Sequence, residues 1–89
     1  MRQITQDTAP KAAGILCNDI AFQNYAAERN GFEEGEFDKS TSAEHIRQIC
    51  GVSSRRELAT DTAAFKRFKE MHTDFLLWSG RLQAPREAG

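Results

Sequence analysis

Six residues near the C-terminal end recur at intervals of three, four and seven positions, and this spacing constrains the fold most strongly. The intervals match an α-helix of about 3.6 residues per turn with one side against a core. Thr60-Asp61 is a typical helix start and Gly80 a typical stop. We therefore expect a helix over residues 61–79, flanked on its apolar side by Met71 and Trp78. The repeating residues are Phe65, Phe68, His72, Phe75, Leu76 and Ser79.

A second apolar stripe begins after Pro10, a residue that opens helices because its missing N–H is not needed in the first turn. Asn18-Asp19 interrupts this stripe and either continues one helix or caps a second one. Asn30-Gly31 ends it, as a left-handed helix stop does. The stripe consists of Ala13, Leu16, Cys17, Ile20, Phe22, Tyr25 and Ala26.

Two capping boxes predict the remaining elements. Thr41 with Glu44 predicts a helix start, and Gly51 ends that helix. Ser54 with Glu57 predicts a very short helix, which Leu58 fastens to the core. The apolar edge of the helix before Gly51 consists of Ile46, Ile49 and Cys50.

No run of alternating β-branched residues predicts a strand. The expected fold is therefore all-α, a compact single-domain bundle of four to five helices, with the long helix packed through its middle. We expect a flexible arm over residues 1–8, the helical domain over 9–80 and a flexible tail over 81–89.

Composition excludes several classes of protein. A chain of 89 residues leaves little room for a deep substrate pocket. The longest bulky apolar run, residues 75–78, is far shorter than the ~20 residues that span a bilayer, and no apolar signal segment follows Met1. Cys17 and Cys50 fall at apolar helical positions, which favours reduced, buried thiols in a cytoplasmic protein.

The two halves of the chain differ in charge. Residues 1–44 carry four Lys/Arg against eight Asp/Glu, a balance of −4, and residues 45–89 carry eight against five, a balance of +3. The asymmetry is either chance or an indication of contact with a polyanion or between opposite halves of two copies.

The segment QICGVSSRREL, residues 48–58, resembles the turn of a helix-turn-helix. The buried positions of that motif do not fit, because Arg47 occupies the place of a small residue, and Glu57 and Thr60 occupy apolar places. The cap at Thr60-Asp61 also ends the second helix too early to read a DNA groove. We therefore interpret the segment as a structural connector.

The basic residues around this connector are the leading candidates for binding. They form either a solvated surface or a surface that holds phosphates, which needs charge but no groove geometry. The candidate residues are Arg47, Arg55, Arg56, Lys66, Arg67 and Lys69.

Catalytic and metal-binding patterns are weak. Cys17, His45, Cys50 and His72 lack the close spacing of a zinc site, and nothing supplies an oxyanion site beside a cysteine nucleophile. His72 is expected in the core. We expect no enzyme activity, no metal and no cofactor.

The acidic loop, residues 31–40, is the alternative candidate. Its phenylalanines either fold back onto the core or stay exposed as a surface for docking a protein. The residues of that docking surface are Phe32, Glu33, Glu34, Glu36, Phe37 and Asp38.

Two linked patterns, LCND..FQ.Y and A..IRQICGVSSRREL..D..AF.RF..M..DF..W, cover residues 16–78. In these patterns the chain resembles small uncharacterised proteins encoded by bacteriophages and prophages. The resemblance implies a bacterial cytoplasmic setting and an accessory role, either in recombination or replication or in blocking a host defence. It carries no catalytic residue.

Three functional hypotheses remain open. The leading one is a non-catalytic binding protein that contacts nucleic acid, or a machine that handles nucleic acid, through the basic residues. The first alternative is an inhibitor of a host defence complex, in the manner of an anti-CRISPR protein, acting through the acidic loop. The second is a small homodimer in which acidic and basic halves meet.

Overall fold

Four α-helices and one short 3₁₀-helix make up residues 4–80, the part of the chain that the computed structural model describes. No strand occurs in this part, which confirms the predicted all-α bundle. The expected tail over 81–89 and the first three residues of the expected arm lie outside the described residues. In chain order the helices are α1 (Ala9–Cys17), α2 (Ile20–Arg29), α3 (Lys39–Cys50), η1 (Arg55–Ala59) and α4 (Thr62–Ser79).

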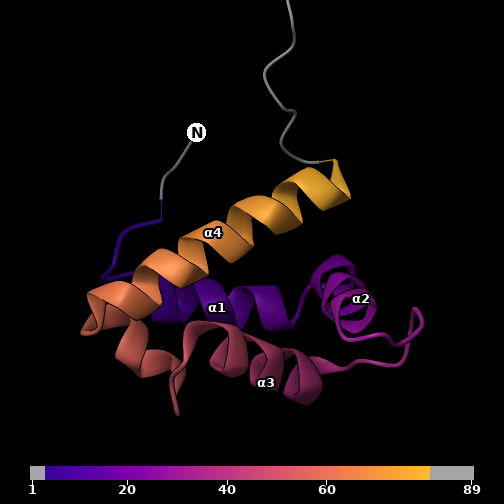
Figure 1. Cartoon of the computed structure of the whole chain (residues 1–89), viewed down its shortest axis with the longest axis horizontal. Helices are drawn as coiled ribbons and strands as arrows, with labels where there is room; N and C mark the ends of the chain where they lie inside the picture. The colour runs from indigo at the N-terminus through magenta and orange to yellow at the C-terminus, as the bar shows by residue number, and fades with distance from the viewer. Residues whose placement is uncertain (1–3, 81–89) are drawn as a thin grey trace, which may run out of the picture.

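The long helix α4 lies along one side of the bundle (Figure 1). It packs on α2, α3 and η1, and α1 packs on the same three elements. In the view of Figure 1, α1 is seen between α4 and α3, but α3 and α4 pack directly on one another, so the long helix joins the core through α2, α3 and η1. The acidic loop extends beyond α2 at the end of the molecule away from η1.

The starts of α2, α3, η1 and α4 are each capped by a side chain. The Asp19 carboxylate accepts from Ala21 N at 2.9 Å, so Asn18-Asp19 separates two helices. The prediction that Ile20 lies on the apolar face is wrong: a new helix begins there in a new rotational register, and Ile20 is 71% exposed.

The start of α3 differs from the prediction. Asp38 is the N-cap and forms the capping box with Thr41, through Thr41 N to Asp38 Oδ1 at 3.0 Å and Asp38 N to Thr41 Oγ1 at 2.7 Å. The hydrogen bonds from Thr41 lower the pKa of the Asp38 carboxyl, so the cap is ionised near neutral pH. A carboxylate suits the positive end of a helix better than a hydroxyl does. The helix therefore begins at Lys39, and Ile49, expected on its apolar edge, is 44% exposed.

The core is centred on three fully buried phenylalanines, Phe22, Phe68 and Phe75. On α4 the buried residues are Ala64, Phe68, Met71 and Phe75. The buried face of α4 therefore differs from the predicted face: it is turned about the helix axis toward Met71. Residues of α2 and α3 lie beside Met71, which explains the difference. The predicted core histidine, His72, is only half-buried and stacks on Phe68, whereas His45 on α3 is buried.

The connector after α3 is as predicted. Ser54 Oγ accepts from Arg56 N at 3.2 Å, and Glu57 Oε2 accepts from Ser54 N at 3.0 Å. Leu58 is fully buried and fixes η1 to the core. Five residues of 3₁₀-helix are too short to present a row of side chains to a DNA groove, in agreement with the structural interpretation of this segment.

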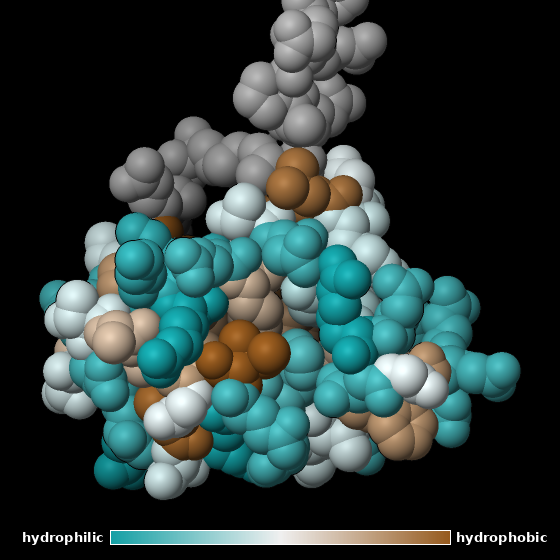
Figure 2. Space-filling model, viewed as in Figure 1, coloured by the Kyte–Doolittle hydropathy of each residue, from teal (hydrophilic) through white to brown (hydrophobic). Residues whose placement is uncertain are grey.

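The molecular surface is mainly hydrophilic on the face shown in Figure 2, with hydrophobic residues in small separate areas. Scattered apolar residues of this kind are usual on a protein surface. Within residues 4–80, none of the helices has the length and apolar character to cross a membrane.

The buried aromatic residues dominate stability. Phe75→Ala is expected to lower the free energy of unfolding by about 3–5 kcal/mol, because it leaves a cavity beside Phe22. Leu77→Ala, on the same helix but 46% exposed, is expected to cost about 1 kcal/mol or less. Urea unfolding followed by circular dichroism measures both, and equal midpoints for the two variants would contradict the described core.

Candidate functional site

An arginine-lined groove lies among α1, α3 and η1, and we call it the arginine groove. It has a volume of about 330 Å³. Its floor consists of apolar residues from α1 and α3, and its rim consists of guanidinium and hydroxyl groups. The floor residues are Ala13, Cys17, Ala43 and Ile46, and the rim residues are Arg47, Ser53, Ser54, Arg55 and Arg56.

Gly14 determines where one of these arginines lies. A Cβ atom at Gly14 would stand 3.2 Å from Arg55 Cζ, so the guanidinium lies directly against the backbone of α1. Glycine weakens the middle of a helix, but here its missing side chain leaves room for the charge. Opposite, Arg47 is oriented by its ion pair with Glu44, at 2.8 Å from Nη2 to Oε1. Within residues 4–80, the guanidinium groups of Arg55 and Arg56 form no hydrogen bond or ion pair.

The groove is electropositive at its floor. Burial raises the pKa of the Cys17 thiol, and the positive charges of Arg55, Arg47 and Lys39 oppose that rise. These charges therefore act at the Cys17 thiol, which lines the groove. Planar guanidinium groups with free N–H donors match the oxygens of phosphate and carboxylate groups, so the arrangement suits an anion.

The other three candidate cations lie elsewhere. On α4, Arg67 and Lys69 are two residues apart, which turns them about 160° from one another around the helix axis. Arg67 Nη1 donates to Cys50 O at 3.2 Å, at the end of α3, and Lys69 Nζ lies 5.1 Å from the Phe65 ring centroid. Lys66 is exposed. The structure thus brings together Arg47, Arg55 and Arg56 in the arginine groove. The three basic side chains of α4 named above lie outside it.

The two phenylalanines of the acidic loop differ in their surroundings: one folds back onto the core and the other stays partly exposed. Phe37 packs on the core, whereas Phe32 is 51% exposed, with the ring centroids 5.4 Å apart. Glu36 accepts from Glu33 N at 2.6 Å and shapes the loop, and Asp38 caps α3. The side chains of Glu33 and Glu34 are exposed.

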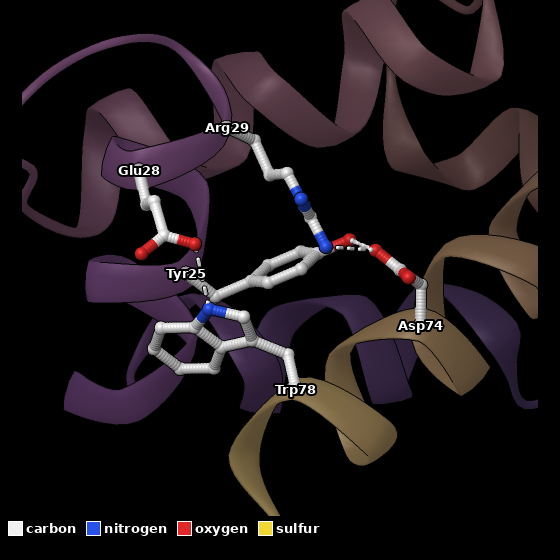
Figure 3. A network of polar contacts seen from close by, with 5 residues as sticks. All are labelled: Tyr25, Glu28, Arg29, Asp74 and Trp78. Atoms are coloured by element: carbon white, nitrogen blue, oxygen red, sulfur yellow. Dashed lines mark hydrogen bonds and ion pairs between the residues drawn. The ribbon is translucent and has the colours of Figure 1, made fainter.

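A polar network between α2 and α4 was missed by sequence reasoning. Asp74 Oδ2 accepts from Tyr25 Oη at 2.6 Å and from Arg29 Nη2 at 2.9 Å (Figure 3). Burial and the hydrogen bond to Asp74 raise the pKa of Tyr25 to about 12. The partners are 49 residues apart, so no local pattern could have indicated them.

A hollow of about 560 Å³ between α2, α3 and α4 adjoins this network. His45 lines it; its Nδ1 lies 3.0 Å from Asn30 Nδ2, and burial lowers its pKa. The charged groups here, two arginines and two acids, oppose one another, so this hollow favours neither an anion nor a cation. Its charged lining residues are Arg29, Arg67, Glu70 and Asp74.

The chemistry of thiols and metals is limited in the described part of the chain. Burial raises the pKa of Cys50 to about 11, so the thiol is protonated near neutral pH and is a poor nucleophile. Cys17 and Cys50 are both free and buried. Residues 4–80 contain no group of three His, Cys, Asp or Glu side chains placed to hold a metal ion.

Comparison with known proteins gave no match among protein-family models, curated proteins or solved structures. The site must therefore be interpreted from its own chemistry.

Removing the Tyr25 hydroxyl tests the network. Tyr25→Phe is expected to lower the free energy of unfolding at pH 7 by about 1 kcal/mol. The hydrogen bond from Tyr25 lowers the pKa of Asp74, so its contribution is present above about pH 4 and is lost as the pH falls through the lowered value. The difference from the parent should therefore shrink in acid. Above about pH 10 the parent loses stability as unfolded tyrosine ionises, and the variant lacks that loss. A constant difference from pH 2 to 11 would contradict the network.

Gly14→Ala separates stability from binding. Alanine is expected to stabilise α1 by about 0.5–1 kcal/mol, because the flexible end of Arg55 can move aside. That movement is small, because the nearest atom, Arg55 Cζ, would stand 3.2 Å from the new Cβ, so the guanidinium stays in the groove and affinity for an anionic ligand should change little while the melting temperature rises. Thermal unfolding and a binding titration on one sample measure both, and a variant that loses stability would show that the Arg55 side chain does not give way.

Proposed function

We propose that this protein is a non-catalytic accessory factor that binds nucleic acid through its phosphate backbone, using the arginine groove. The observation that carries the proposal is the convergence of Arg47, Arg55 and Arg56 on one groove. Two of the three guanidinium groups have their donors free within the described residues. Free charged donors are what a phosphate ligand requires.

The proposed binding does not depend on the base sequence of the nucleic acid. Phosphate contacts position a protein on nucleic acid but carry no base information, and η1 is too short to read a groove. An affinity of this kind depends strongly on salt, because each neutralised phosphate releases counterions. An accessory role is also what the resemblance of residues 16–78 to small phage-encoded proteins implies, either in recombination or replication or in blocking a host defence, and the resemblance does not choose between the two. The two free, buried cysteines support a reducing, cytoplasmic setting.

A charge-reversal pair with a matched control tests the proposal. Arg55→Glu with Arg56→Glu changes the charge of the groove, and Lys66→Glu with Lys69→Glu makes the same change on exposed positions of α4. Labelled duplex DNA, single-stranded DNA and RNA are titrated at several salt concentrations. For duplex DNA, log-affinity of the parent should fall with log salt by about 0.9 per neutralised phosphate, and the groove variant should show a weaker affinity and a shallower slope.

The control variant should retain most of the parent's affinity and slope. Equal losses in both variants would mean that net charge, and no particular groove, holds the ligand. Absence of binding to every nucleic acid at low salt, where electrostatic contacts are strongest, would refute the proposal and leave recognition of a host protein or self-association as the function.

A further inference from the structure

A second charged groove, opposite in character to the first, lies between α2, the acidic loop and the end of α4. We call it the acidic–aromatic groove. It has a volume of about 430 Å³. Two of the segments that line it, α2 and the acidic loop, lie at the end of the molecule away from η1 (Figure 1). Its lining residues are Asn24, Glu28, Phe32, Glu33, Glu34 and Trp78.

The tryptophan of this groove is held in a defined orientation. Trp78 Nε1 donates to Glu28 Oε2 at 2.8 Å, and the indole packs against the Tyr25 ring with centroids 5.6 Å apart. In Figure 3 the indole reaches from α4 toward α2, with its nitrogen at the Glu28 carboxylate. The side chain nevertheless remains 37% exposed, so part of the ring is available for contact. An indole held in place loses little conformational entropy when it binds a ligand.

The loop that forms the other wall is also fixed. Phe32 N donates to Ala27 O at 2.8 Å, and Gly35 N donates to Asn24 Oδ1 at 3.0 Å. These bonds tie the loop to α2 and place Phe32, which is 51% exposed, at the groove. The groove therefore presents two partly exposed aromatic rings, one from the acidic loop and one from α4.

The carboxylates of the groove lack cationic partners. Within residues 4–80, the ion pairs join Arg29 to Asp74 and Arg47 to Glu44, and neither involves Glu28, Glu33 or Glu34. None of the lining residues carries a positive charge. Three acids beside two aromatic rings form a negative site with hydrophobic walls, which repels phosphate and attracts an organic cation.

The geometry points to a docking site for an arginine-bearing segment of a partner protein. A guanidinium group stacks on an aromatic face and donates two parallel N–H bonds to the oxygens of a carboxylate, whereas an ammonium group does neither as well. Trp78 and Phe32 supply the faces, and Glu33 and Glu34 supply the carboxylates. The inference goes beyond the proposed nucleic-acid binding and does not depend on it, because the two grooves share no residue.

The site contains its own reporter, because Trp78 is the single tryptophan of the chain. The full chain is titrated at low salt, without nucleic acid, with the synthetic peptide Ac-Gly-Arg-Gly-Arg-Gly-NH₂ and with its lysine and glutamate counterparts. Trp78 fluorescence and the NMR signal of its indole N–H are followed. The arginine peptide should change both signals saturably, the lysine peptide should bind more weakly, and the glutamate peptide should have no effect.

Glu33→Gln with Glu34→Gln should raise the dissociation constant of the arginine peptide about tenfold, since two exposed charge contacts are lost. Asp7→Asn with Glu70→Gln removes the same charge at exposed positions outside the groove and should leave it unchanged. All four sites are exposed, so both variants should keep the parent's melting temperature. Equal weakening in both variants, or no Trp78 response at low salt, would overturn the inference. So would a groove variant that changes only the concentration-dependent sedimentation of the protein, because the occupant would then be a second copy.

Discussion

The contact between α2 and α4 holds the remaining structure in place. Phe75 is fully buried, and its ring meets the edge of Phe22 with centroids 5.2 Å apart and the Tyr25 ring at 5.4 Å. Aromatic pairs at this spacing stabilise beyond the area that they bury. Because α4 is fixed there, Asp74 and Trp78, one position before and three after Phe75, meet their partners on α2. One packing contact thus positions both the polar network and one wall of the acidic–aromatic groove.

At the end of the molecule that holds the arginine groove, the charged side chains are positioned by the close approach of neighbouring elements, which small side chains allow. The buried face of α1 contains Ala9 and Ala13, whose small side chains let neighbouring elements come near. Leu58 anchors η1 in the core, and Gly14 lets Arg55 lie against the helix backbone. The guanidinium groups of Arg55 and Arg56 are not needed to hold the connector, because its buried leucine and its capping box do so. Their charge therefore remains available to a ligand.

Boundaries of helices could be predicted from sequence where the signal is local. Asp61, Gly51 and Gly80 end or begin helices as expected, because capping depends on neighbours in the chain. Which side of a helix is buried depends on packing, so Ile20 and Ile49 were placed wrongly. The start of α3 was misplaced because two local signals competed, and the carboxylate of Asp38 formed the cap.

For the candidate site, too, the local features could be predicted from the sequence and the features that depend on packing could not. The cluster of basic residues was visible in sequence, since Arg55 and Arg56 follow a recognisable turn. Their separation from Lys66, Arg67 and Lys69 depends on how η1 joins α4, which sequence spacing does not report. The contribution of Trp78 to the acidic–aromatic groove was also hidden, because Glu28 lies 50 residues away from it.

The two grooves explain how a chain of net charge −1 can offer strong local fields of both signs. Exposed charges more than a Debye length apart, about 10 Å at 0.1 M salt, are screened from one another, so grooves separated by more than this distance would each act on a ligand mainly through their own charges. The helices between the grooves share one buried core, with no linker between the two sites. A phosphate backbone at one end and an arginine-bearing protein at the other would then be held at a fixed separation. Bridging of this kind requires no conformational change, only occupancy of both grooves, and it joins the proposed nucleic-acid binding to the proposed docking of a partner in one small domain.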